Sequence, residues 1–293
     1  MTTPATFAAH PITAADGRRT VVDEYTPDFP LETDSAVLFL PALGVPIGYY
    51  RPLFEQWAAR GRRVFGLEIR GQERSSASDV RRNDFGYATI LEQDLPAALE
   101  QTPLGSIPRL IVVGHSLGGQ LALAAAGSGI LHPDRIVMIA SGSTTYRAAS
   151  TPLRRVARRM VTPTFLAITA VVGHFPGDRI GFGGRQPKTM MADWHREGWY
   201  GAYRFAGTDV DYEEALGHVD VPILAVTFAR DPFVPHASAD LLLARVSPAR
   251  PDRVRLTVAD NGGIPLDHVR WVRQNPALVL DVVEGWLRAR PPS

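Results

Sequence analysis

Residues 110–119 read Leu-Ile-Val-Val-Gly-His-Ser-Leu-Gly-Gly, an apolar run that leads directly into the pattern Gly-x-Ser-x-Gly. This pattern predicts a nucleophilic serine, Ser116, on a sharp turn between a strand and a helix. Such a turn strains the serine backbone and brings the flanking chain so close that glycine is needed at Gly114 and Gly118. The apolar run is typical of a buried strand and residues 120–126 favour a helix, so the context fits a nucleophile elbow.

Strand and helix patterns alternate through most of the chain. A hairpin is expected over residues 6–25, around the turn Asp16-Gly17. Further strands are expected at 36–40, 63–69, 109–113, 135–140, 222–228 and 253–259, and helices at 50–60, 85–100, 117–128, 236–246 and 269–288. This order predicts an α/β fold with a mostly parallel sheet flanked by helices on both faces, the hairpin forming an antiparallel edge.

The alternation stops between residues 142 and 217. We therefore expect a core of residues 1–141 and 218–293 with an inserted, mainly helical cap or lid of residues 142–217. The arginines at 154, 155, 158 and 159 are expected on a solvated helix face, the alternative being contacts with an anionic substrate or carrier. The aromatic residues of this segment either pack the cap onto the core or line an apolar substrate pocket, for which the candidates are Trp194, Trp199 and Tyr200.

Composition limits the classes of protein that the chain can represent. With 293 residues and 45 % hydrophobic residues it can bury a large core, and a net charge of +1 argues against nucleic acid as a partner. Cysteine is absent, which excludes disulfides and thiolate metal sites. We see no signal peptide and no apolar stretch of the roughly 20 residues that a membrane span needs, so we expect a cytoplasmic protein without stable membrane insertion.

A serine hydroxyl is a weak nucleophile and needs a histidine base that a carboxylate orients. Of eight histidines, His268 lies in the loop after the last expected strand and is the strongest candidate for the base. Asp231, in a proline-stiffened turn at the end of a strand, is the candidate for the carboxylate. The alternatives are His195 and His236 for the base, and Asp260 and Asp267 for the acid.

An oxyanion needs two preorganised donors. The backbone N–H of Leu117 is expected to be one, because it lies at the N-terminus of the helix that follows Ser116. The second is expected in the loop of residues 41–46, at the backbone N–H of Leu43.

The chain order Ser116, Asp231, His268, with the elbow and an upstream oxyanion loop, resembles the α/β-hydrolase superfamily over nearly the whole chain outside the cap. The segment 70–75, Arg-Gly-Gln-Glu-Arg-Ser, is similar to the family's Arg-Gly-x-Gly-x-Ser loop, with Glu73 in place of the second glycine and Glu68 in place of the common aspartate before it. Pro41-Ala42-Leu43-Gly44 replaces the frequent His-Gly and resembles a little-characterised bacterial branch, serine-aminopeptidase-like or lysophospholipase-like.

The resemblance implies a serine esterase or thioesterase that cleaves a mostly apolar acyl group from a small-molecule or carrier-bound substrate through an acyl-enzyme. It implies no metal and no organic cofactor. Two alternatives stay open: an acyltransferase or biosynthetic cyclase that passes the same acyl-enzyme to a non-water acceptor, and a ligand-binding protein without turnover. Acyl length, leaving group, pathway and oligomeric state do not follow from these residues.

Overall fold

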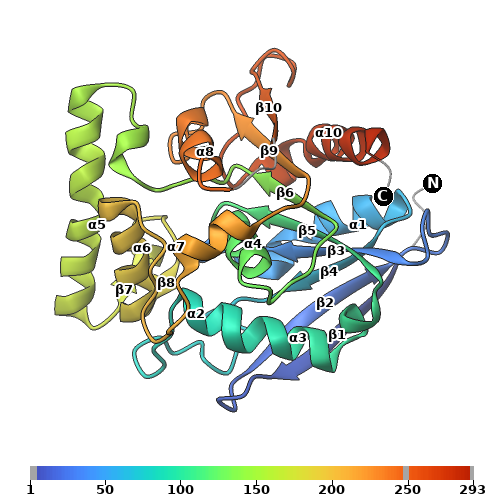
Figure 1. Ribbon diagram of the computed structural model, residues 1–293, viewed down its shortest axis with the longest axis horizontal. Helices are drawn as coiled ribbons and strands as arrows, with labels where there is room; N and C mark the ends of the chain where they lie inside the picture. The colour runs from blue at the N-terminus through green and yellow to red at the C-terminus, as the bar shows by residue number, and fades with distance from the viewer. Residues whose placement is uncertain (1–4, 247–250, 291–293) are drawn as a thin grey trace.

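The computed structural model describes residues 5–246 and 251–290, so the outermost ends of the expected core lie outside the described residues. Its central feature is an eight-stranded sheet with the strand order β1-β2-β4-β3-β5-β6-β9-β10 (Figure 1). The strands are β1 (Thr6–Thr13), β2 (Arg19–Thr26), β3 (Ser35–Leu40), β4 (Arg63–Leu67), β5 (Arg109–His115), β6 (Arg135–Ile139), β9 (Ile223–Phe228) and β10 (Asp252–Leu256). The strands from β4 to β10 are parallel, whereas β1 and β2 form an antiparallel hairpin that pairs with β4.

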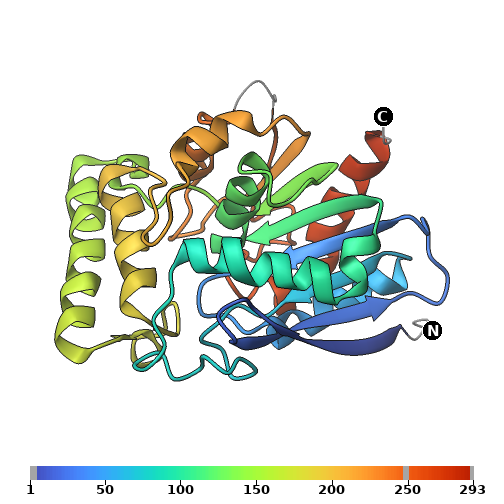
Figure 2. The same cartoon turned by 60° about the horizontal axis from the view of Figure 1, so that its bottom comes forward.

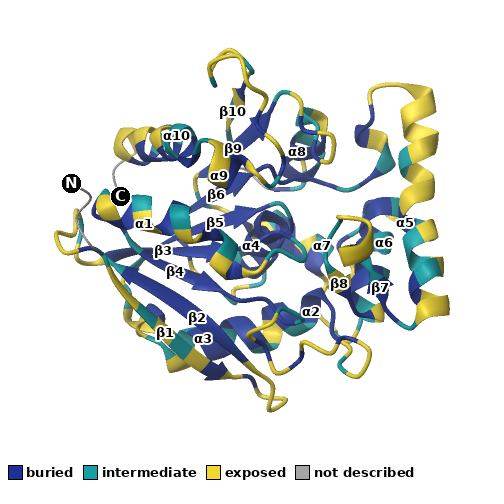
Figure 3. Cartoon of the chain, turned by 180° about the vertical axis from the view of Figure 1, so that it is seen from behind, coloured by how far each residue is buried: buried dark blue, intermediate teal, exposed yellow. Residues whose placement is uncertain are grey.

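Two hydrophobic clusters cover the two faces of the sheet. On one face lie α1 (Arg51–Ala59), α9 (Trp271–Gln274) and α10 (Pro276–Ala289). The other face carries α2 (Tyr87–Thr89), α3 (Leu95–Gln101), α4 (Leu117–Gly127) and α8 (His236–Leu243). Burial on both faces explains why β3 is an uninterrupted apolar run after Ser35, and Figure 3 shows the central strands in the colour of buried residues, whereas the edge strand β1 is largely exposed.

Most of the chain between β6 and β9 forms a separate layer at one end of the molecule (Figures 1 and 2). This layer contains α5 (Pro152–Val172), the short ribbon of β7 (Phe175–Pro176) and β8 (Arg185–Gln186), and α6 (Lys188–Tyr200), whereas α7 (Tyr212–Ala215) lies against α4. Thr151 caps the start of α5 by accepting a hydrogen bond from the Arg154 N–H, and Gly173 ends it in the left-handed conformation. The helices α5 and α6 pack side by side, and the outward face of α5 is exposed (Figure 3).

The predicted fold class is confirmed, and two predicted helices are wrong in detail. The helix expected over residues 85–100 starts at Tyr87 and contains one π-helical turn, Ile90–Asp94, in which the Leu95 N–H donates to the Ile90 carbonyl. Pro96 follows at once; it lacks an N–H, so the regular ladder cannot continue through it. The helix expected over 269–288 is two helices, because Pro276 follows the non-helical Asn275.

Candidate active site

The elbow forms where β5 ends and α4 begins. Ser116 has φ 52° and ψ −114°, a conformation that a non-glycine residue rarely adopts. A Cβ atom on Gly114 would lie 2.2 Å from the backbone of Gly118, and one on Gly118 would lie 2.0 Å from the carbonyl oxygen of Leu40. Both glycines are therefore required by backbone approach, as the sequence pattern predicts. The Ser141 Oγ, from the chain after β6, donates to the Ser116 carbonyl at 2.6 Å and braces the turn.

Ser116, His268 and Asp231 lie within hydrogen-bond distance of one another in series. The His268 Nε2 is 3.0 Å from the Ser116 Oγ, and its Nδ1 is 2.6 Å from the Asp231 Oδ2, across 152 and 37 residues of sequence. The other carboxylate oxygen of Asp231 accepts the N–H groups of Phe233 and Val234, which fixes its orientation. With Nδ1–H donating to the carboxylate, Nε2 is left free to accept the serine proton.

The competing residues hold other parts of the fold. Their hydrogen bonds are His195 to Thr162, His236 to Thr227, Asp260 to Thr257, and Asp267 to the N–H groups of Val269 and Arg270. The structure therefore assembles one series of serine, imidazole and carboxylate, and it uses the residues that the chain order favours.

The loop of residues 41–46 follows β3 and lies beside the elbow. Neither the Leu43 N–H nor the Leu117 N–H has an acceptor within residues 5–246 and 251–290, so both donors are free. Gly44 has φ 71°, and a Cβ there would lie 2.0 Å from the carbonyl oxygen of Gly183. The turn between β7 and β8 thus rests directly on this loop.

Glu68 holds the chain just after this loop, at Ile47. It is fully buried, and its Oε2 accepts the Ile47 N–H at 2.5 Å. Burial raises the pKa of Glu68 to about 7, although the hydrogen bond from Ile47 acts in the opposite direction. A glutamate at this position is therefore part of the support of the loop.

A row of aromatic side chains leads from the cap to the imidazole. The rings of Phe233 and His268 are 5.3 Å apart, Phe182 lies 5.5 Å from Phe233, and Trp194 lies 5.6 Å from Phe182. Phe182 and Phe233 were not predicted, because one lies in a glycine-rich segment and the other in a turn after a strand. The packing of residues 175–186 against the core brings them together.

The other two aromatic candidates lie elsewhere in the cap. The Cζ of Arg159 lies over the Trp199 ring, 4.4 Å from the ring centroid. The centroids of the Trp199 and His195 rings are 5.7 Å apart. Tyr200 is 65 % exposed at the end of α6. Neither belongs to the aromatic row that reaches His268.

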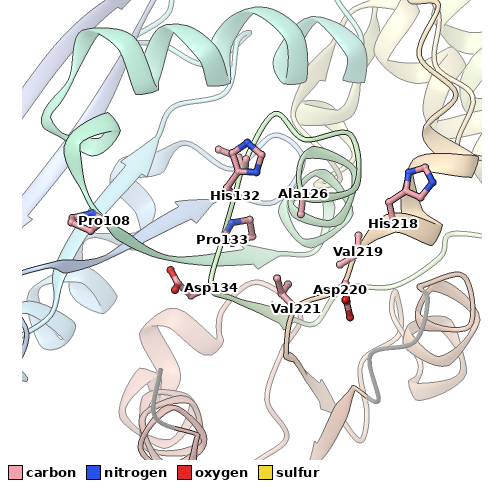
Figure 4. A pocket seen from close by; sticks show the side chains of 10 residues that line it. Pro108, Ala126, His132, Pro133, Asp134, His218, Val219, Asp220 and Val221 are labelled. Atoms are coloured by element: carbon pink, nitrogen blue, oxygen red, sulfur yellow. The ribbon is translucent and has the colours of Figure 1, made fainter. Parts of the chain in front are cut away.

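A surface pocket of about 380 Å³ is lined by residues that include Ala126, His132 and His218 (Figure 4). Its lining residues include Pro108, Asp134 and Val221, which lie one or two residues before the starts of β5, β6 and β9. The pocket therefore lies at the amino ends of the strands, whereas Ser116 and Asp231 lie at the carboxyl ends, where open α/β sheets build their sites. It plays no part in the arrangement around Ser116.

Within the described ranges, no three His, Asp or Glu side chains gather in a group that could hold a metal ion. No helix of that part of the chain is long and apolar enough to cross a membrane.

Known proteins share this architecture. A model of the alpha/beta hydrolase family matches residues 37–282, most of the chain. The chain belongs to this family. No curated protein matches the sequence.

Several solved structures have folds similar to that of this hydrolase. A thioesterase domain from the curacin biosynthetic pathway has a TM-score of 0.59 at 15 % identity, over 96 % of this chain and 99 % of that one. The esterase domain of a Rhodothermus marinus protein has a TM-score of 0.59 at 16 % identity, covering 97 % and 98 %. A bacterial membrane phospholipase A has a TM-score of 0.62 at 14 % identity, covering 97 % and 86 %. At these identities the likeness establishes the fold.

Proposed function

We propose that the protein hydrolyses an ester or thioester through an acyl-enzyme on Ser116. The observation that carries this proposal is the hydrogen-bonded series from Ser116 through His268 to Asp231 at the carboxyl edge of the sheet. Esterase, thioesterase and phospholipase structures share the fold, which agrees with attack on an acyl carbon.

In the proposed reaction the His268 Nε2 accepts the Ser116 proton as the Oγ attacks the carbonyl carbon. Asp231 holds the imidazole tautomer and stabilises the imidazolium that forms. The free N–H groups of Leu43 and Leu117 are the proposed donors to the oxyanion. The imidazolium then gives its proton to the leaving alcohol or thiol, and water activated by the same imidazole releases the carboxylic acid.

The proposed substrate class rests on the aromatic side chains beside the His268 imidazole. Phe233 contacts the His268 ring, and Phe182 and Trp194 continue this apolar surface into the cap. Aromatic rings favour contact with an alkyl chain over a charged group. We therefore propose a mostly apolar acyl group, on a small molecule or a carrier.

Labelling with a fluorophosphonate tests the mechanism. We expect the wild-type enzyme and Ser128→Ala to be labelled and Ser116→Ala to stay unlabelled; Ser128 is a matched control because its hydroxyl only bonds the Ala125 carbonyl at the end of α4. Labelling of Ser116→Ala, or no labelling of the wild type, contradicts the proposed nucleophile.

Hydrolysis of esters that differ in acyl length tests the substrate class. We expect Phe182→Ala to raise KM several-fold for an octanoyl ester and to leave KM for an acetyl ester unchanged. Phe29→Ala is the control, because this side chain is 79 % exposed. Equal changes for both esters would argue against an acyl site along the aromatic row.

A further inference from the structure

His115 is buried directly beside the nucleophile and takes no part in the proton transfer described above. It is fully buried at the end of β5, and its ring packs against Tyr50, His268 and Trp271 with centroid distances of 5.8, 5.3 and 5.5 Å. A buried imidazole needs partners for both nitrogens. The identity of those partners shows what the side chain does.

The two nitrogens of His115 bond to two different parts of the site. Nδ1 is 2.7 Å from the hydroxyl oxygen of Tyr50, and Nε2 is 2.8 Å from the backbone carbonyl oxygen of His268. The same Tyr50 oxygen accepts the backbone N–H of Ala42 at 3.1 Å. These contacts form one unbroken chain of three hydrogen bonds.

The proton positions along this chain are determined by its ends. A carbonyl oxygen can only accept, so the Nε2 of His115 carries the proton and donates to His268. The Nδ1 then accepts from the Tyr50 hydroxyl, whose oxygen accepts from Ala42. The Trp271 Nε1 lies 3.3 Å from the same Nε2, but a protonated Nε2 has no lone pair and cannot accept a hydrogen bond from it. Burial lowers the pKa of His115 well below its usual range, which keeps the ring neutral.

We propose that Tyr50 and His115 are positioning residues. They fix three segments relative to one another: the proposed oxyanion loop, the elbow and the loop that carries His268. Ala42 directly precedes Leu43, a proposed oxyanion donor, and His115 directly precedes Ser116. The chain ends on the backbone of the residue that bears the base. This inference rests on the proposed function, since it assigns no chemistry beyond the placement of its groups.

Tyr50→Phe breaks the chain and leaves the packing intact. The Tyr50 ring lies against Phe39 and Phe54, at 4.6 and 6.1 Å, and a phenylalanine ring keeps both contacts. The variant removes only the hydroxyl and leaves the Ala42 N–H and one nitrogen of His115 unpaired. Small displacements of reacting groups can cost up to about a hundredfold in rate. We expect kcat to fall about tenfold with KM within twofold.

Tyr87→Phe is the matched control. Tyr87 is fully buried, and its hydroxyl has no partner in the part of the chain that the structure describes. We expect its kcat, KM and rate of fluorophosphonate labelling to equal those of the wild type. A purely structural hydroxyl at Tyr50 would lower the Tm of Tyr50→Phe and leave kcat and the labelling rate unchanged, which would overturn the inference.

A double-mutant cycle with His115→Gln tests whether the two residues act as one unit. If the three hydrogen bonds act as one unit, the second substitution adds little once the first has broken the series. The kcat of the double variant should then lie within twofold of that of the slower single variant. Losses that multiply would show independent effects and overturn the inference. A labelled wild type with an unchanged Tyr50→Phe would overturn this inference alone, whereas an unlabelled wild type would overturn the proposed function with it.

Discussion

The buried carboxylate beneath the oxyanion loop makes stability depend on pH in an unusual direction. Glu68 has one oxygen bonded to the Ile47 N–H, and the other has no partner within the described residues. Its pKa is raised from 4.5 to about 7, chiefly by burial and further by the charge of Asp23, while the charge of Arg74 lowers it. Above that pH the native protein must hold a poorly solvated carboxylate.

Proton linkage gives the sign and the size of the change in the free energy of unfolding with pH. The native state binds this proton more tightly than the unfolded chain, so the free energy of unfolding falls as the pH rises from about 4.5 to about 7. Each pKa unit is worth about 1.4 kcal/mol, so the whole shift corresponds to roughly 3 kcal/mol. Below pH 4.5 Glu68 is protonated in both states and has no such effect.

Urea denaturation of the wild type and Glu68→Gln at pH 4, 6 and 8 measures this quantity. The glutamine oxygen can still accept the Ile47 N–H, and its side chain does not titrate. We expect the free energy of unfolding of Glu68→Gln, relative to the wild type, to rise by about 3 kcal/mol between pH 4 and pH 8.

Asp34→Asn provides a control that removes a carboxylate with a lowered pKa. A hydrogen bond from Arg109 lowers the pKa of Asp34 below its ordinary value of 3.8, so the stability that this carboxylate contributes is gained below about pH 4 and is fully present above it. The free energy of unfolding of Asp34→Asn, relative to the wild type, should therefore stay nearly constant between pH 4 and pH 8, the range over which that of Glu68→Gln rises. A difference between Glu68→Gln and the wild type that is constant with pH, or that falls, would refute the reasoning.

Three further substitutions test the site and the core. Asp231→Asn should lower kcat by about 10⁴-fold in ester hydrolysis, because the amide favours the wrong imidazole tautomer; a loss below tenfold would contradict its role. Gly118→Ala should abolish fluorophosphonate labelling, since its Cβ would lie 2.0 Å from the Leu40 carbonyl oxygen, and full labelling would show that the turn relaxes. Glu284→Ala should cost about 1.5–3 kcal/mol in urea denaturation, because Arg62 loses its buried partner at 3.1 Å and keeps Glu32 at 3.2 Å, and a loss under 1 kcal/mol would contradict this.

The features that sequence predicts best are those set by short-range geometry. The hairpin turn at Gly17 has the positive φ that its sequence predicts, at 76°. The elbow is similar, because Gly114 and Gly118 are close in sequence and their need for glycine arises within one turn. Asp231 and His268 were predicted from their places after strands, since parallel strands bring their carboxyl ends to one edge.

The features that sequence does not predict depend on contacts between distant elements. Phe182 reaches Phe233 only because the ribbon of β7 and β8 rests on the oxyanion loop, a packing that no local periodicity encodes. Tyr50 reads as one more apolar residue at the start of a helix, and its hydroxyl acquires a role only beside His115, 65 residues away. The role of a buried polar group depends on the partners that the fold brings to it, and these partners can be distant in sequence.

Several of these contacts meet at residues 41–47, which include the proposed oxyanion loop. The Ala42 N–H is bonded to Tyr50, the Val45 N–H to the Ala42 carbonyl, and the Ile47 N–H to Glu68. The loop is thus fixed at both ends and at its turn, and the Leu43 N–H remains free among the described residues. A donor held in this way needs no reorganisation when charge develops on a substrate oxygen, which is the main source of electrostatic stabilisation in such sites. A carboxylate that costs stability at neutral pH is therefore tolerated beneath this loop, because it fixes the backbone from which that donor points.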